Sequence, residues 1–154
     1  MGLGSVGTAQ LQRLQGLLSA LMSSQRPINS LVVVLHHAVT RRTSDAWSWR
    51  EAWSWRELRK TLGNSSIYAH TVLALDANDA TNIVSMLEDV ARTRPDIQVV
   101  LAHGHRHGPA YLGQTPGGVL IVEADGVIDS REPGFWAASQ TGGKLTFKWL
   151  TVSQ

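Results

Sequence analysis

Two stretches of the sequence place hydrophobic residues at helical spacing. The first stretch starts near the candidate cap Thr8 and ends before Pro27, with polar residues between its leucines. The second runs over residues 79–92 and is followed by the stop signal Pro95. The apolar positions are Leu11, Leu14, Leu17, Leu18 and Leu21 in the first stretch, and Ala80, Ile83, Val84, Leu87, Val90 and Ala91 in the second. Both patterns predict amphipathic helices that bury one face.

The remaining hydrophobic runs are short and rich in β-branched residues, which is typical of strands. Residues 31–35 are continuously apolar, as expected of a strand buried on both faces. Residues 97–102 and 118–123 predict two further strands, and residues 145–152 alternate well enough to form a last one. The order strand, helix, strand predicts an α/β fold with a right-handed crossover in a largely parallel sheet, followed by antiparallel additions.

Length and composition agree with a globular protein. The chain has 154 residues, 43% of them hydrophobic and 17% charged, which suits a single domain with a real core. Cysteine is absent, so disulfides and thiolate metal sites are excluded. The formal net charge is +2 and no stretch concentrates Lys and Arg, so a nucleic-acid partner is not indicated. Without a signal-peptide pattern or an apolar run of about 18 residues, we expect a soluble, cytoplasmic chain with no membrane partner.

A tryptophan-rich tandem repeat interrupts the pattern of helices and strands. The six-residue sequence AWSWRE occurs at positions 46–51 and again at 52–57. One interpretation is a duplication within a surface segment that tolerates changes in sequence. The other is a flap or insertion over residues 43–60, lying beside an active site or binding a partner, because exposed aromatic residues often anchor interfaces. One small helix cannot bury four tryptophans, so we expect some of them to be exposed.

Histidines gather directly after two of the predicted strands. They are His36 and His37 after the first strand, and His103, His105 and His107 after the second. Because ligands bind at the carboxyl ends of the strands in α/β sheets, neighbouring strands would bring these imidazoles together. Neutral imidazole is a common metal ligand, and residues two apart in extended chain point to the same side. The sequence therefore predicts a metal site, with His70 left as an ordinary hydrogen-bonded residue and His103 unassigned.

The histidine motifs resemble those of the calcineurin-like metallophosphoesterases. Residues 31–38, LVVVLHHA, resemble the strand and His-His motif of that family, and residues 104–107, GHRH, resemble its Gly-His-x-His motif. Residues 8–14, 95–103 and 117–124 resemble the helix and strands that flank these motifs in the family. The resemblance spans nearly the whole chain, 1–154, as a single partial domain. It implies the C-terminal half of an α/β metallo-dependent phosphatase sandwich, a mixed sheet with flanking helices.

The resemblance also implies roles for individual residues. His36 and His105 would ligate one metal, and His107 would ligate the other. His37 would act beside them as a catalytic residue that either supports a metal ligand or contacts the phosphate, and Arg106 would bind substrate. The family implies two divalent metals, such as Mn, Fe or Zn, which clamp the phosphoryl oxygens and lower the pKa of a bound water. The implied reaction is hydrolysis of phosphomonoesters or phosphodiesters by a metal-bound hydroxide.

The sequence also departs from the family pattern. Its Asp-x-His, Gly-Asp-x-x-Asp and Gly-Asn-His motifs have no counterpart here, and Ala38 stands where a proline usually follows His-His. We therefore expect at most partial metal occupancy, with the missing carboxylates supplied by an upstream region or a second chain. Two alternatives stay open. One is a non-catalytic remnant or interaction module that uses the tryptophan repeat, and the other is a mononuclear three-histidine zinc site.

Overall fold

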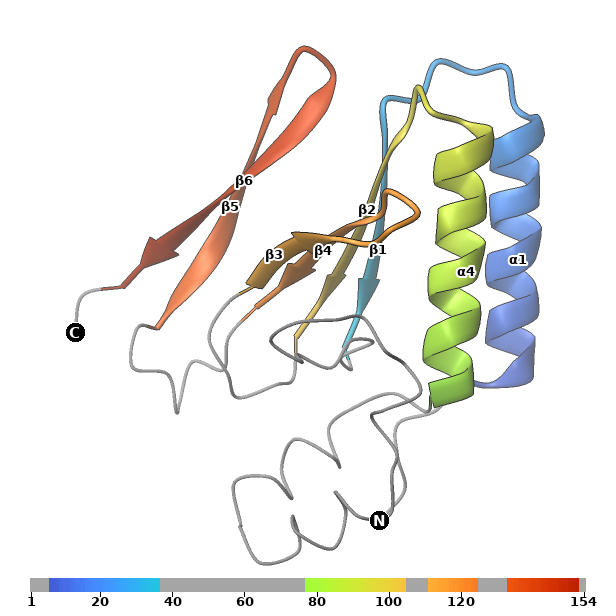
Figure 1. Ribbon diagram of the computed structural model, residues 1–154, viewed down its shortest axis with the longest axis horizontal. Coiled ribbons are helices and arrows are strands. Elements are labelled where there is room, and N and C mark those ends of the chain that lie inside the picture. The colour runs from blue at the N-terminus through green and yellow to red at the C-terminus, as the bar shows by residue number, and fades with distance from the viewer. Residues whose placement is uncertain (1–5, 37–76, 105–110, 125–132, 153–154) are drawn as a thin grey trace, which may run out of the picture.

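The structure, a computed structural model, describes residues 6–36, 77–104, 111–124 and 133–152 (Figure 1). The chain is mixed α/β, with two helices on one face of a four-stranded sheet and a separate hairpin on the other side (Figure 1). In chain order the elements are α1 (Thr8–Ser23), β1 (Ser30–Leu35), α4 (Ala77–Thr93), β2 (Gln98–His103), β3 (Tyr111–Gln114), β4 (Leu120–Glu123), β5 (Gly134–Thr141) and β6 (Lys144–Thr151). The predicted tryptophan-rich insertion, 43–60, lies outside the described residues.

The four-stranded sheet is parallel except at one margin. Its strand order is β1-β2-β4-β3, with β1, β2 and β4 parallel and β3 antiparallel to β4. The predicted parallel sheet with antiparallel additions is therefore confirmed. In the register, Leu35 lies opposite His103, and His103 lies opposite Glu123. The carboxyl ends of the three parallel strands therefore meet at one edge of the sheet.

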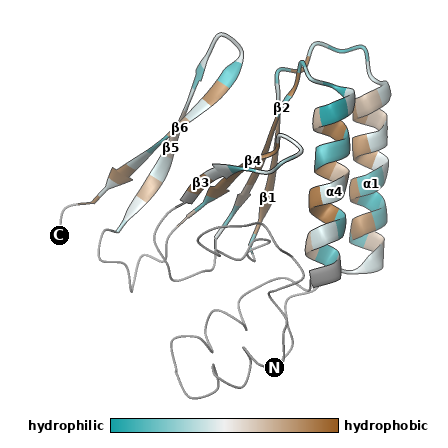
Figure 2. Cartoon of the chain, in the orientation of Figure 1, coloured by the Kyte–Doolittle hydropathy of each residue, from teal (hydrophilic) through white to brown (hydrophobic). Residues whose placement is uncertain are grey.

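The hydrophobic core lies between the two helices and the sheet. As the sequence predicts, α4 buries one face and leaves the opposite face polar, which Figure 2 shows as alternating brown and teal along the helix. Its side chains pack on alternate residues of β2 and β4, and the central members of this cluster are Ile83, Leu87, Val90, Val99, Leu101, Val119 and Ile121. From β1, Leu31, Val33 and Leu35 pack against the same cluster. Removing this surface from water supplies most of the driving force for the fold.

The prediction that β1 is buried on both faces is wrong. Val32 is 45% exposed and Val34 is 73% exposed. Because β1 is an outer strand of the four-stranded sheet, it has a neighbouring strand on one side only. The helices cover the face that carries Val33. The described hydrogen bonds of the hairpin reach β2 and β4, and they reach β1 at its first residue, where the Ser30 hydroxyl donates to the Gly143 carbonyl over 3.5 Å.

The hairpin of β5 and β6 is attached to the sheet by side-chain hydrogen bonds. The Trp136 indole donates to the Glu123 carbonyl over 2.8 Å. The Gln98 amide donates to the Leu145 carbonyl over 2.9 Å, and its oxygen accepts from the Leu145 amide over 2.6 Å. On the hairpin, Trp136 lies edge-to-face against Trp149, with ring centroids 5.3 Å apart. These contacts place an aromatic layer on the side of the sheet away from the helices.

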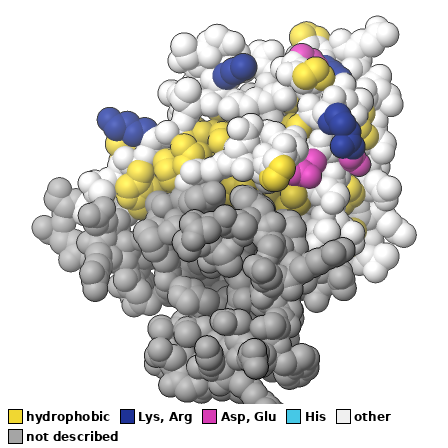
Figure 3. Space-filling view, viewed as in Figure 1, with side chains coloured by type: hydrophobic (Ala, Val, Ile, Leu, Met, Phe, Trp, Pro, Cys, Tyr) yellow, Lys and Arg dark blue, Asp and Glu magenta, His cyan; other side chains and the backbone are white. Residues whose placement is uncertain are grey.

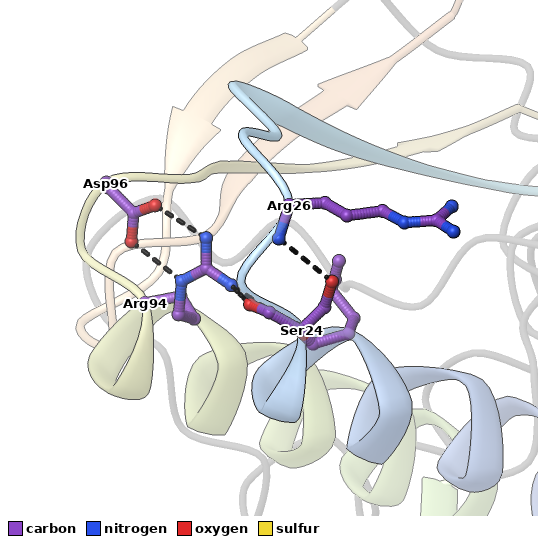
Figure 4. Close-up of polar contacts among 5 residues, drawn as sticks. Ser24, Arg26, Arg94 and Asp96 are labelled. Atoms are coloured by element: carbon purple, nitrogen blue, oxygen red, sulfur yellow. Dashed lines mark hydrogen bonds and ion pairs between the residues drawn. The ribbon is translucent and has the colours of Figure 1, made fainter.

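The ends of the two helices are joined by Arg94, just after α4. Figure 4 shows its guanidinium between the Asp96 carboxylate and the end of α1. Its Nη1 donates to the carbonyls of Ser24, over 2.8 Å, and Leu21, over 3.3 Å. The last carbonyls of a helix have no partners within the helix, so these hydrogen bonds give partners to carbonyl groups at the end of α1.

Candidate functional site

The candidate site lies at the carboxyl edge of the sheet, where three parallel strands end side by side. β1 ends at Leu35, β2 at His103 and β4 at Glu123, and these three residues are successive partners in the register. β3 returns antiparallel, so Tyr111 lies opposite Glu123 in the same row. Polar residues thus replace the hydrophobic ones where β2 and β4 reach this edge, although the strands are apolar along most of their length.

His36 is the described member of the predicted metal-ligand set. It follows β1 directly, and its side chain is exposed to solvent. Its backbone neighbour Leu35 pairs with His103 on β2, so the two segments that carry the histidine motifs leave adjacent strands at the same edge. Imidazole is a common ligand of divalent metals, so His36 stays a candidate ligand at this edge.

Two buried ionisable residues lie at this edge beside His36. His103 and Glu123 are each 3% exposed. Each lies two residues beyond a core residue of its strand, Leu101 in β2 and Ile121 in β4, so both lie on the face of the sheet that the helices cover. From the sequence alone, His103 had no assigned role and Glu123 did not stand out. The sequence did contain a signal for both residues: each is a polar residue that ends a buried apolar run, and the two runs form adjacent strands.

The other predicted site residues fall outside the described part of the chain. They are His37, His105, Arg106 and His107. The structure therefore places His36, His103 and Glu123 at the ends of adjacent strands without grouping their side chains, and it does not describe the remaining predicted ligands. Within residues 6–36, 77–104, 111–124 and 133–152, no group of three or more His, Cys, Asp or Glu side chains could hold a metal ion.

The described charges lie mostly away from this edge. On the face seen in Figure 3, Lys and Arg side chains are scattered, and a band of hydrophobic side chains runs from the hairpin toward the sheet. Arg94 and Asp96 form an ion pair just before β2 begins, at the opposite edge. Their hydrogen bond lowers the pKa of Asp96 and raises the pKa of Arg94, which serves the fold rather than the candidate site.

Comparisons with known proteins give no relative. No protein-family model, curated protein or solved structure matches the chain. Among the helices in the described residues, none is long and apolar enough to cross a membrane.

Proposed function

We propose that the chain is the C-terminal half of a calcineurin-like metallophosphoesterase domain, a metal-dependent hydrolase of phosphate esters. The observation that carries the proposal is the pairing of β1 with β2. These strands are parallel neighbours, and Leu35 lies opposite His103. The His-His motif and the Gly-His-x-His motif therefore leave the sheet from adjacent strands at one edge, as a shared metal site requires.

In this proposal the chain supplies imidazole donors and contacts to the substrate. His36 and His105 hold one metal, His107 holds the other, and His37 and Arg106 contact the phosphate. Two divalent metals of the Mn, Fe or Zn class supply the Lewis acidity that activates water and stabilises the phosphoryl oxygens. The remaining ligands are carboxylates that an upstream region or a second chain provides, which makes the site complete only in the assembled domain.

The test is hydrolysis of a chromogenic phosphodiester, with added Mn²⁺, by the purified chain together with a segment that carries the missing carboxylates. We expect turnover to fall at least tenfold in the variants His36→Ala and His105→Ala, because each removes a ligand of the same metal. His70→Ala is the matched control, since His70 belongs to neither histidine motif, and it should keep the activity. Mn²⁺ affinity, followed by electron paramagnetic resonance, separates loss of metal from loss of chemistry.

Two results would argue against the proposal. Turnover that survives in His105→Ala would remove this residue from the ligand set. A folded chain that binds no Mn²⁺ and hydrolyses nothing, alone or with a segment carrying the missing carboxylates, would favour the non-catalytic interaction module. One metal per chain, bound without added carboxylates, would instead favour the mononuclear three-histidine site.

A further inference from the structure

The outer strand β1 carries backbone groups that face away from the sheet. In a parallel pair of strands, alternate residues direct their N–H and C=O groups at the neighbouring strand. The Gln98 amide donates to the Asn29 carbonyl over 2.9 Å, so the odd-numbered residues along β1 are the ones whose backbone faces β2. The N–H and C=O groups of Val32 and Val34 therefore point to the outer edge, where no strand within the described ranges pairs with β1.

The hairpin leaves this part of β1 uncovered. Its tip lies at the amino end of the strand, where the Ser30 hydroxyl donates to the Gly143 carbonyl. Its other end lies at β4, where the Trp136 indole donates to the last carbonyl of that strand. The hairpin therefore crosses the sheet from the start of β1 to the end of β4. In agreement with this path, exposure rises from 45% at Val32 to 73% at Val34 as β1 runs away from the hairpin tip.

The sequence of β1 lacks the features that prevent strand edges from pairing. Proteins protect such edges with charged side chains, proline, bulges or very short strands. β1 is SLVVVL, a strand of six residues without charge, proline or glycine, and its register with β2 is unbroken. Its three valines favour the extended conformation. The open edge is therefore suited to the addition of a further strand.

A second copy of the chain fits this edge in both geometry and charge. In an antiparallel pair related by a two-fold axis at Val33, Val32 of each copy lies opposite Val34 of the other copy. Val32 and Val34 are the residues whose backbone groups point outward, so each such pair exchanges both of its backbone hydrogen bonds. The valine side chains then adjoin on the exposed face, and no charged side chain of β1 meets a like charge.

The contact area sets the expected strength of this pairing. A standard protein interface buries about 800 Å² on each partner. Two exposed valine side chains on each copy supply a small part of that area, so the backbone hydrogen bonds carry most of the pairing. The resulting dimer is weak and depends on the protein concentration.

We propose that two copies of the chain pair through the open edge of β1 and join their four-stranded sheets into one. The strand order leaves β1 as the outer strand, and the open backbone groups of Val32 and Val34 select a strand as its partner. The pairing of residues 31–35 uses none of the proposed metal ligands. It therefore goes beyond the proposed function and does not depend on it.

The first test is sedimentation equilibrium between about 10 μM and 1 mM protein. The apparent mass of the wild type should rise toward twice that of the monomer. Val34→Lys should lower the dimer affinity about tenfold or more, because it brings two lysines to diagonal positions across the pair. The lysine stays in solvent in the monomer, since position 34 is 73% exposed. Circular dichroism checks that the variant is folded.

The matched control is Leu112→Lys on β3, the other outer strand of the same sheet. It also replaces an exposed apolar side chain with lysine, at a position that is 43% exposed. This variant has the same net charge as Val34→Lys and should dimerise as the wild type does.

Hydrogen exchange of the wild type tests the same edge without a variant. The amides of Val33 and Leu35 face β2, so they should be protected at every protein concentration. The amides of Val32 and Val34 should exchange rapidly in dilute solution. At high concentration they should exchange about tenfold or more slowly, because the second copy gives them hydrogen-bond partners.

Four results would overturn the proposal. The first is a wild type that stays monomeric up to about 1 mM. The second is slow exchange of the Val32 and Val34 amides in the monomer, which would mean that a single chain covers its own edge. The third is a dimer that Leu112→Lys disrupts and Val34→Lys leaves intact, which would place the interface on β3. The fourth is an apparent mass that keeps rising past twice the monomer, which would mean open-ended association instead of a two-fold pair.

Discussion

Arg94 illustrates how a single side chain joins parts of the chain that are distant in sequence. Its guanidinium donates to Leu21 and Ser24 at the end of α1 and to both oxygens of Asp96, over 2.7 and 2.9 Å. The hydrogen bond from Arg94 lowers the pKa of Asp96 below its usual value of 3.8. Asp96 therefore stabilises the folded state when ionised. This contribution is present above the pKa of the unfolded chain and is lost as the pH falls through the lower, folded pKa.

For this reason we expect Asp96→Asn to lower Tm at pH 7, and the difference from wild type to shrink as the pH falls below the usual aspartate pKa of 3.8. The measurement is thermal unfolding followed by circular dichroism across this pH range. Asp89→Asn is a suitable control, because Asp89 pairs with the exposed Arg92 on the surface of α4 and such pairs contribute little. A difference in Tm that stays constant down to pH 2 would contradict the ion-pair explanation.

Some individual positions were predictable and others were not. His36 was placed correctly at the end of a strand, because an apolar run that stops at a histidine fixes both the strand and its terminus. Glu123 was not singled out, since its place opposite His103 follows from the register, which is a property of the folded sheet. The exposure of Val34 was likewise hidden, because an apolar run does not reveal whether its strand is central or outer.

Of the two helices, α4 contributes more buried residues to the hydrophobic core than α1 does. Leu87 is fully buried between α1, β2 and β4 neighbours in the core cluster. Truncating it to alanine removes the apolar contact and leaves a cavity that a packed core does not close. We therefore expect Leu87→Ala to reduce the free energy of unfolding by about 2–5 kcal/mol, measured by urea denaturation.

The control for this prediction is Leu17→Ala on α1, where the leucine is 62% exposed. It should change the free energy of unfolding by no more than about 0.5 kcal/mol. Equal losses in the two variants would mean that α4 does not form the core as described. The contrast also separates burial from helix propensity, because both changes replace leucine with alanine within a helix.

The helices were predicted well at the level of elements, and the short strands less so. α1 and α4 each repeat an apolar face over several turns, and Pro27 and Pro95 lie beyond their ends. β3 and β5 were not predicted. In β5 the available signal was Gly142-Gly143, a two-residue turn with positive φ at both positions, 58° and 81°. Such a pair connects the strands of a hairpin, which would have supplied a partner for the predicted last strand.

At the scale of the whole molecule, Gln98 links the hairpin to the sheet. Its side chain makes two hydrogen bonds to the backbone of Leu145, one as donor and one as acceptor. We expect Gln98→Ala to raise the hydrogen-exchange rate of the Leu145 amide about tenfold or more, since each bond contributes about 1 kcal/mol. Lys148→Ala, an exposed change on β6 opposite Ala137, should leave that rate unaltered. No change in either variant would mean that other contacts hold the hairpin in place.

The layered arrangement was only partly readable from the sequence. Alternating helices and strands predicted an α/β fold with a mixed sheet, which the structure confirms for the described residues. The hairpin on the face opposite the helices was not predicted, because its attachment depends on Gln98 and Trp136, which contact residues distant in sequence. The candidate site was also only partly predictable. Its location at the carboxyl edge follows from the pattern of strands, whereas the residues that lie next to one another there follow from the register.

The parallel pairing of β1 with β2 also has a consequence for how fast the chain folds. β1 ends at Leu35 and β2 begins at Gln98, so this pairing must close a long loop before any contact between the strands repays the lost entropy. The hairpin has only Gly142 and Gly143 between its strands and can form within about 1–10 μs. We therefore expect the hairpin to form early and the parallel sheet late, so the edge that carries the histidines would be completed near the end of folding.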